Sequence, residues 1–291
     1  FAAVVVVSAF ILRYTVYGRS LYAIGSSPTA ARLVGIRTKR LLAITFILSA
    51  SCAGLAALIV GLFVLFSALR PSFLHVNLTL VPLQADLAVF VVVGLAQMSV
   101  LSLGHMNLAL GRMAALSAFA SGFVYDRFDV PLLAGLAVGL IVCAGIGAIA
   151  GLIITATGVN SFVVTLALDF ALLGLVSLLY SGFSDGVAFG VRPAGMEELR
   201  SDTFSDYCIG NVCGPPVPLI VPFALVAVVV VGILFRVTLA GRAILMTGSN
   251  IRAARLSGIR VERRIIQAHT LSGVLAALAG FLLAMNTGAF S

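Results

Sequence analysis

Charged residues are scarce in this sequence. Asp, Glu, Lys and Arg together make up 10% of its 291 residues, whereas hydrophobic residues make up 61%. Soluble globular domains carry about 25% charged residues, so this composition excludes an ordinary soluble domain. The chain is long enough for several membrane-spanning helices, because each needs about 20 apolar residues.

Motifs for catalysis and for ATP binding are lacking as well. The phosphate-binding pattern G-x-x-x-x-G-K-[ST] does not occur, so any ATP hydrolysis is expected in a separate protein. The three histidines and four cysteines do not have the ligand spacing of a metal site, and the sequence contains no convincing nucleophile–base pair. We therefore expect a non-enzymatic protein without a metal or another cofactor.

The few charged residues are unevenly distributed. A net charge of +8 would suggest a nucleic-acid partner in a soluble protein, but here the basic residues lie beside apolar segments. Arg13–Arg40 contains six basic residues and no acidic one, and Arg236–Arg264 contains seven basic residues and Glu262. Membrane proteins keep an excess of Lys and Arg in their cytoplasmic loops. We expect both stretches in the cytoplasm, the acidic loops outside, and no nucleic-acid partner.

The two basic stretches are copies of one another. GRSLYAIGSSPTAARLVGIRTKR begins at position 18 and GRAILMTGSNIRAARLSGIRVERR at position 241, an offset of 223 (241 − 18). Each copy predicts a short helix, Pro28–Val34 or Ile251–Ser257, because a capping residue precedes it and a glycine, Gly35 or Gly258, follows it. So short a helix is marginal alone in water, and it needs a partner surface or the bundle to stabilise it.

The apolar runs predict an all-α, polytopic membrane protein, since backbone polar groups in lipid must be satisfied within their own segment. We expect one partial span at 1–12, which continues upstream of Phe1, and about seven fuller spans. A glycine-bounded interruption near 104–111 breaks the helical pattern. The fuller spans lie near residues 41–69, 80–103, 112–125, 131–154, 162–180, 217–235 and 265–285.

Several of these segments resemble the bacterial ABC transporter permeases of the ribose/simple-sugar type. The pattern GR-x-x-x-x-x-G-S-x-x-x-AAR-L-x-GI-R is similar to their cytoplasmic loop, SLGHMNLALG to their broken-helix motif, and NSFVVTLALDFALLGLVSLLYSG to one of their spans. The resemblance covers essentially the whole chain, and it implies two joined permease copies. Residues 1–69 would be a partial first copy with its docking loop, and residues 70–291 a second copy, truncated after its docking loop and next span.

The resemblance implies the membrane-spanning subunit of an ABC importer in the bacterial inner membrane, which translocates a sugar-like solute. Its implied partners are a cytoplasmic ABC ATPase subunit, a periplasmic solute-binding protein, a second permease subunit and the lipid bilayer. Two alternatives stay open. SLGHMNLALGRMAAL also resembles a segment of the branched-chain amino-acid permeases, and a truncated chain is compatible with a non-transporting membrane scaffold.

Three polar residues are candidates for the substrate path. The resemblance places His105 and Asn107, which stands where the family usually has Asp, near this path, and Asp169 lies eight positions into its span. Ionisable groups inside a membrane are costly and by default indicate function. An equal alternative for His105 is a helix-end residue whose ring bonds a carbonyl, and His269 is expected to form a hydrogen bond between helices.

The resemblance further implies that the two short helices dock the ATPase subunit. The docking residues would be Ala30, Ala31, Arg32, Gly35 and Ile36 in the first copy, and Ala253, Ala254, Arg255, Gly258 and Ile259 in the second.

Two further features bear on packing and on the external loop. Cys208 and Cys213 lie in an external loop, where an oxidising compartment permits a disulfide between them. Two pairs of glycines, each at four-residue spacing, let helix backbones approach closely; they are Gly135 with Gly139 and Gly147 with Gly151.

Overall fold

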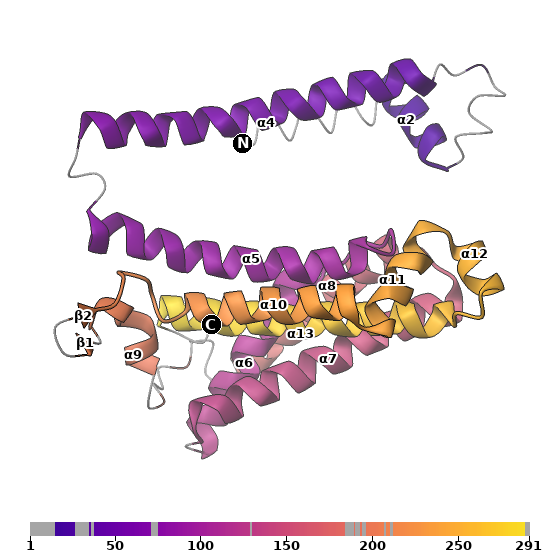
Figure 1. Cartoon of the computed structure of the whole chain (residues 1–291). Helices are drawn as coiled ribbons and strands as arrows, with labels where there is room; N and C mark the ends of the chain where they lie inside the picture. The colour runs from indigo at the N-terminus through magenta and orange to yellow at the C-terminus, as the bar shows by residue number, and fades with distance from the viewer. Residues whose placement is uncertain are drawn as a thin grey trace. The chain divides into compact units, whose positions relative to one another are not determined.

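Helices account for most of the protein, as the apolar runs predicted (Figure 1). The computed structural model describes residues 15–26, 35, 38–70, 75–128, 130–183, 189, 193, 196–206, 208–209 and 212–288. The chain divides into two compact units, Phe1–Leu74 and His75–Ser291.

The first unit contains two described helices, α2 (Val16–Ser26) and α4 (Thr38–Leu69). The Thr15 hydroxyl accepts a hydrogen bond from the Gly18 N–H at 3.3 Å and so caps the start of α2. The Tyr17 and Thr45 hydroxyls lie 2.8 Å apart and join α2 to α4. The last ten residues of α4 are mostly exposed and apolar, as expected for a helix that faces lipid.

The second unit is a helical bundle organised around α13 (Val261–Thr287). In α13, 72% of the most apolar stretch is buried, against 11% in the least buried of the other spans. Helix α13 packs against α5, α6 and α7. The other helices of this unit are α5 (Val81–Leu101), α6 (Leu110–Phe128), α7 (Leu132–Thr157), α8 (Ser161–Phe183), α9 (Met196–Ser201), α10 (Val221–Val237), α11 (Leu239–Ser249) and α12 (Ile251–Leu256).

Short elements complete the second unit. A π-helical turn, η2 (Val76–Leu80), leads into α5, and a 3-10 turn, η3 (Phe204–Asp206), follows α9. The strands β1 (Cys208–Ile209) and β2 (Val212–Cys213) form an antiparallel hairpin. The all-α class is therefore confirmed, with this hairpin as the one sheet within the described residues.

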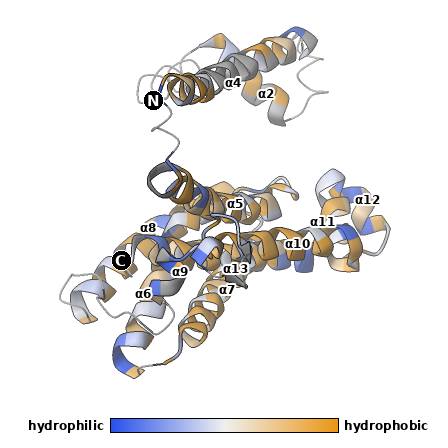
Figure 2. Ribbon diagram, turned by 60° about the vertical axis from the view of Figure 1, so that its left-hand side comes forward, coloured by the Kyte–Doolittle hydropathy of each residue, from blue (hydrophilic) through white to orange (hydrophobic). Residues whose placement is uncertain are grey.

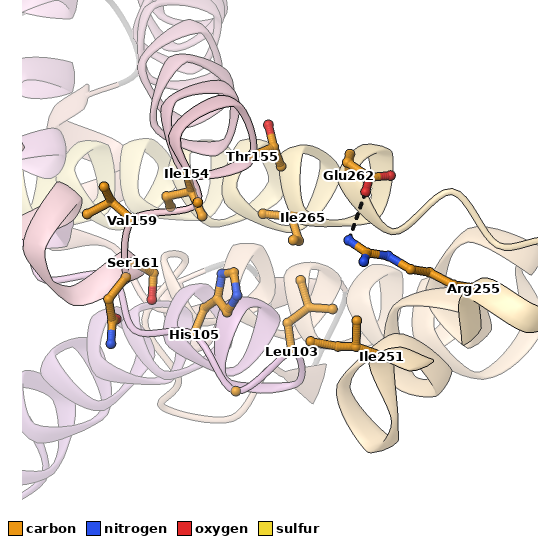
Figure 3. Close-up of a pocket in the computed structure, with 13 residues that line it drawn as sticks. Leu103, His105, Ile154, Thr155, Val159, Ser161, Ile251, Arg255, Glu262 and Ile265 are labelled. Carbon is orange, nitrogen blue, oxygen red and sulfur yellow. Dashed lines mark hydrogen bonds and ion pairs between the residues drawn. The ribbon is translucent and has the colours of Figure 1, made fainter. Parts of the chain in front are cut away.

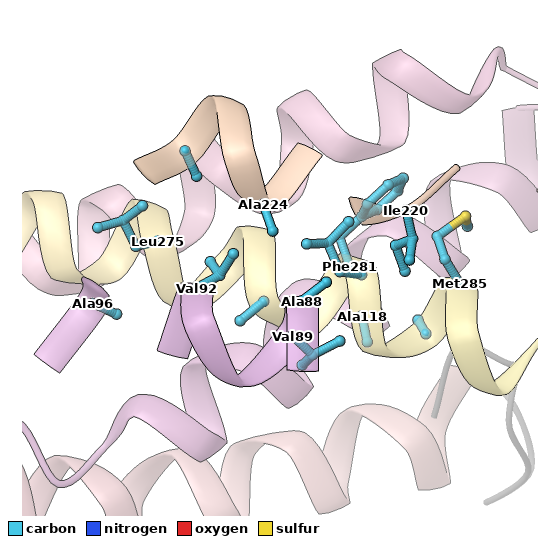
Figure 4. Packing of buried hydrophobic residues seen from close by; sticks show 14 of the residues in the cluster. Ala88, Val89, Val92, Ala96, Ala118, Ile220, Ala224, Leu275, Phe281 and Met285 are labelled. Atoms are coloured by element: carbon cyan, nitrogen blue, oxygen red, sulfur yellow. The ribbon is translucent and has the colours of Figure 1, made fainter. Parts of the chain in front are cut away.

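The core of the second unit is built from small and branched side chains. Figure 4 shows Ala88 and Val92 of α5 beside Ala224 of α10, with Leu275 and Phe281 of α13 packed against them. Small residues let the helix axes come close and so increase van der Waals contact between the helices. In lipid this packing takes the place of the hydrophobic driving force, which is missing between helices there. The outer faces of the spans stay apolar, as the colouring of α7 and α10 in Figure 2 shows.

The four glycines of α7 confirm the predicted close packing, since all four are buried. A Cβ added to Gly135 would meet the Tyr125 ring, and one added to Gly139 would meet the Ser117 hydroxyl. A Cβ at Gly147 or Gly151 would meet the backbone of α13. Larger side chains at these positions would separate α7 from α6 and α13.

The predicted interruption is present, although it begins and ends earlier than expected. Helix α5 ends at Leu101 and α6 begins at Leu110, so the non-helical stretch is 102–109 rather than 104–111. Gly104 has a φ of +76°, a left-handed conformation that favours glycine.

Four of the described helices, α5, α7, α8 and α13, are long and apolar enough to cross a membrane. A fifth span results if the pair α10 and α11, which is bent by 72°, counts as one. The polytopic class is thus confirmed, and the count of one partial plus about seven spans stays a prediction.

The two ends of the second unit differ in charge. One end carries α11, α12 and the start of α13, with the basic residues of the second stretch; the opposite end carries α9 and the β1–β2 hairpin (Figure 1). The latter end holds more acidic than basic residues: Asp86, Asp126, Glu197, Asp202 and Asp206 against Arg127 and Arg200. By the positive-inside rule the α11–α12 end faces the cytoplasm.

Candidate functional site

The interruption between α5 and α6 is held in place by α8. The Ser161 hydroxyl accepts a hydrogen bond from the Met106 N–H at 3.3 Å, and the Thr165 hydroxyl accepts one from the Leu108 N–H at 3.2 Å. These side chains replace bonds that a continuous helix would have made, as membrane-buried backbone requires. The interruption is therefore an ordered part of the bundle.

Asn107 ties the same stretch to α13. Its Nδ2 donates to the Ser272 hydroxyl at 3.0 Å, and its Oδ1 accepts from the Ala109 N–H at 3.1 Å. The side chain is buried, with 4% of the residue exposed. In this conformation Asn107 stabilises the interruption rather than facing an open cavity.

His105 contacts a second histidine. Its Nδ1 lies 3.3 Å from Nε2 of His269, so one ring donates a hydrogen bond to the other. His269 is fully buried on α13, and its bond reaches the non-helical interruption rather than, as had been expected, another helix. The ring of His105 is thus bonded to another ring, and not to a carbonyl as the alternative had it.

Asp169 lies apart from this pair. Its Oδ1 is 3.8 Å from Nε of Arg112, and this ion pair joins α8 to α6. Asp169 lies one helical turn beyond Thr165 in α8. The structure therefore brings His105 and Asn107 together along the interruption and places Asp169 with Arg112. The sequence analysis did not identify Arg112 as the partner of Asp169. The available signal was a basic residue directly after the glycine at the start of α6.

A cavity of about 550 Å³ opens beside the interruption, at the α11–α12 end of the bundle. Figure 3 shows His105 at one side of this cavity and the Arg255–Glu262 pair at another. Thr155 of α7 and Asn160, directly before α8, also line it, whereas Asn107 and Asp169 do not.

The short helix predicted in the second basic stretch is present as α12. Asn250 is its N-cap, because the Asn250 side chain accepts a hydrogen bond from the Ala253 N–H at 3.1 Å. The helix ends at Leu256, one residue before the predicted end. Gly258 follows with a φ of +79°, as its predicted left-handed position requires.

The side chains of α12 divide between the bundle and the solvent. Ala254 is buried, so it packs against its own chain, whereas Ala253 is exposed. Leu256 is 91% exposed, although it is a large apolar residue. Arg255 is exposed and pairs with Glu262 at 3.1 Å. The sequence analysis did not single out Leu256 as an exposed apolar residue of this helix. The available signal was an apolar residue between an arginine and the closing glycine.

The first docking segment is described only in part. Gly35 has a φ of +84°, which matches its predicted left-handed position. The helix predicted at Pro28–Val34 lies outside the described residues, as do the docking candidates Ala30, Ala31, Arg32 and Ile36.

Helix α11 connects the docking segment to the interruption. A Cβ added to Gly248 would meet the carbonyl oxygen of Ser102, and Leu103 Cα lies 3.0 Å from the same point. The end of α11 thus rests on the backbone of the first residues of the interruption. A displacement of α11 would press directly on this stretch.

The external cysteines lie opposite one another. Cys208 and Cys213 are Cα partners in the antiparallel register of β1 and β2. Facing residues in such a pair have Cα atoms about 4.5–5.5 Å apart, within the range that a disulfide spans. Their side chains lie outside the described part of the chain, and the disulfide stays a prediction.

Taken together, these features define a polytopic membrane protein in which a short, basic helical segment, α11–α12, rests on an interrupted helix. The family described as "Branched-chain amino acid transport system / permease component" matches residues 1–100 and again residues 81–291. The chain belongs to this family of ABC transporter permeases, and the resemblance to its simple-sugar members is confirmed. It is a multi-pass protein of the bacterial inner membrane.

Two relatives illustrate the similarity. The chain is 31% identical to the autoinducer 2 import system permease protein LsrD of Photorhabdus temperata, over 80% of this chain and 67% of the relative. It is 27% identical to the D-allose transport system permease protein AlsC of Escherichia coli (strain K12), over 77% of this chain and 65% of the relative. The matches thus span about two thirds of each relative's length. No solved structure matches the chain.

Proposed function

We propose that this chain is the membrane subunit of an ABC importer that translocates a sugar-like solute. It would receive the solute from a periplasmic binding protein and work with a second permease subunit and a separate ATPase subunit. The contact between Gly248 and Ser102 carries this proposal, because it links the cytoplasmic docking segment to the polar interruption. The names of the two relatives, an autoinducer 2 import permease and a D-allose transport permease, support a sugar-like solute.

Docking of the ATPase subunit is assigned to α12 and its closing turn. Ala253, Arg255 and Leu256 are exposed there, and Gly258 and Ile259 turn the chain back towards α13. An exposed leucine beside arginines suits an apolar groove with an acidic rim. The repeated sequence extends the same role to Ala30, Ala31, Arg32, Gly35 and Ile36 of the first copy.

The substrate path is proposed to follow α6 and α8 inward. Asp169 and Arg112 would offer hydrogen bonds to solute hydroxyl groups. Asn107 would lie closer to the cytoplasm along the path, and His105 closer still. Because Asn107 is buried and bonded to Ser272 in this conformation, the path at that level requires the interruption to move. Movement of α11 against Ser102 would provide it.

The two-copy organisation is proposed on two grounds. The family matches two overlapping ranges of the chain, and the docking segment recurs at an offset of 223 residues. Residues 1–69 are accordingly assigned to a partial first copy and residues 70–291 to a second.

Uptake by reconstituted protein tests the function. The chain would be placed in proteoliposomes with an ATPase subunit, a binding protein and luminal ATP, and uptake of D-allose, autoinducer 2 and L-leucine would be measured. We expect ATP-dependent uptake of a sugar-like solute. Uptake of leucine alone would favour the branched-chain amino-acid alternative, and absence of all uptake despite a bound ATPase would favour the scaffold.

A matched pair of variants tests the path. Asp169→Asn removes the charge that pairs with Arg112, and we expect uptake to fall roughly tenfold, about the effect of one charge-assisted hydrogen bond. Asp86→Asn makes the same chemical change at an exposed position, where Asp86 accepts a hydrogen bond from Asn286 at 2.7 Å. Equal uptake by both variants and the parent would contradict the path role of Asp169.

A further inference from the structure

The cavity of about 550 Å³ receives polar side chains from five segments of the chain. His105 comes from the interruption, Thr155 from α7, Asn160 from the turn before α8, and Arg255 and Glu262 from α12 and the start of α13 (Figure 3). Apolar side chains from the same elements separate these groups. The volume lies within the range of about 300–1,000 Å³ that small-molecule sites occupy.

Several of these side chains keep unused hydrogen-bonding capacity. Asn160 uses Oδ1 to accept from the Phe162 N–H at 3.0 Å, and its Nδ2 bonds to nothing in the described residues. His105 uses Nδ1 for the bond to His269, and within the same residues its Nε2 has no partner. Thr155 donates to carbonyl oxygens of its own helix, so its oxygen can still accept.

The charges at the cavity wall compensate each other. Arg255 and Glu262 are the charged residues among those that line it, and Nη2 of Arg255 lies 3.1 Å from Oε1 of Glu262. A phosphate or carboxylate would have to compete with Glu262 for the guanidinium. A neutral solute with several hydroxyl groups and apolar C–H faces fits this mixture of donors, acceptors and branched aliphatic side chains.

We propose that this cavity is an exit site, which binds a neutral, polyhydroxylated solute on the cytoplasmic side of the interruption before release. This inference rests on the proposed import function and adds a site to it. The cavity wall includes Arg255 of the docking helix, so a bound solute contacts the element that is proposed to dock the ATPase. By linkage, solute in the cavity and the ATPase-driven position of α12 influence each other reciprocally. Solute that accumulates in the cytoplasm should therefore slow its own import.

The test uses D-allose on both sides of proteoliposomes that contain the chain, its ATPase subunit and its binding protein. The initial rate of labelled D-allose uptake is measured with unlabelled D-allose in the lumen, and with L-alanine at equal osmolarity as the control. We expect luminal D-allose to lower the initial rate at least twofold, and L-alanine to leave it unchanged.

The variant Thr155→Val, Asn160→Ser separates the site from the fold. Valine is close to threonine in shape, and serine retains the ability to cap α8, so both changes remove polar groups from the cavity with little change in packing. We expect the luminal concentration that halves the rate to rise about tenfold, which corresponds to the loss of two neutral hydrogen bonds. Thr157→Val is the control, since Thr157 is exposed on the same helix and does not line the cavity.

A second variant covers the case in which the first disturbs the protein. Val159→Trp fills the cavity from its wall, so the rate that this variant retains in empty vesicles should no longer fall when D-allose is added to the lumen. If luminal D-allose does not lower the initial uptake rate of the parent, or if it lowers the rates of both variants as much as that of the parent, the exit site alone is overturned. Absence of uptake into empty vesicles overturns the import function, and the exit site with it.

Discussion

The α2–α4 and α11–α13 segments can be compared directly, because their sequences are copies at an offset of 223 residues. Helix α2 begins and ends at the residues that correspond to the ends of α11. Helix α4 begins at Thr38, and α13 begins at the corresponding residue, Val261. Both boundaries of α2 and α11, and the starts of α4 and α13, are thus set by the repeated sequence.

The capping contacts agree as closely as the boundaries. Thr15 accepts from the Gly18 N–H, and Thr238 accepts from the Gly241 N–H. The two glycines that close the docking segments have φ values of +84° and +79°. Local residues therefore determine the local conformation in both copies, whatever surrounds them.

The environments of the following helices differ. Helix α13 is the buried centre of its unit, and its residues Ile266 and Thr270 are partly buried, whereas their counterparts in α4, Ala43 and Ile47, are exposed. Gly273 of α13 allows contact with the backbone of α7, and the corresponding residue of α4 is Ala50. His269 of α13 bonds to His105, and its counterpart is Phe46. Burial thus follows from contacts with other elements, which the repeat does not encode.

The largest expected effect is on the packing of α13. A Cβ at Gly273 would meet the carbonyl oxygen of Cys143, so Gly273→Leu should destabilise the bundle by about 3 kcal/mol or more. Ala50→Leu, the corresponding change in α4, is the comparison. Thermal unfolding in detergent measures both.

Gly145→Leu is the matched control for this change. Gly145 lies in α7, and a Cβ there would have no neighbour within 4 Å. Equal destabilisation by Gly273→Leu and Gly145→Leu would contradict the close packing of α7 and α13.

The next effect concerns the contact between α11 and the interruption. Gly248→Ala places a methyl group against the carbonyl oxygen of Ser102, and overpacking of this kind costs about 1–3 kcal/mol. We expect ATP-dependent uptake to fall several-fold while the ATPase subunit still co-purifies. Gly25→Ala, the corresponding change in α2, is the comparison. Unchanged uptake by Gly248→Ala would show that this contact does not transmit motion.

Sequence patterns predicted the features that depend on neighbouring residues. The helical class, the cap and closing glycine of α12, and the glycine face of α7 follow from spacing and from the conformational limits of single residues. The pairing of Asp169 with Arg112, and that of His105 with His269, depend on how distant helices are rotated against one another. The burial of Ala254 beside an exposed Leu256 depends on which face of α12 meets the bundle. Such rotations are set by tertiary contacts, and no local pattern records them.

A smaller and equal effect is expected at the two closing glycines. Both Gly35 and Gly258 have positive φ, a conformation that costs other residues about 1–2 kcal/mol. Gly35→Ala and Gly258→Ala should therefore weaken the local turn to the same extent. Recovery of the ATPase subunit with the purified chain measures docking, and the two variants combined should lower it more than either alone. Full recovery with both changes present would leave the two segments as basic loops without a docking role.

The smallest effect is expected at the caps of α2 and α11. Thr15→Val and Thr238→Val each remove one hydroxyl that accepts from the N–H three residues later, and losing a cap costs about 0.5–2 kcal/mol. Hydrogen exchange of the Gly18 and Gly241 amides should accelerate by a similar factor in the two variants. Thr15→Ser and Thr238→Ser keep the hydroxyl and should exchange like the parent. A strong acceleration at one copy only would show that the surroundings, and not the repeated residues, hold that helix start, and the local equivalence of the two copies would then be wrong.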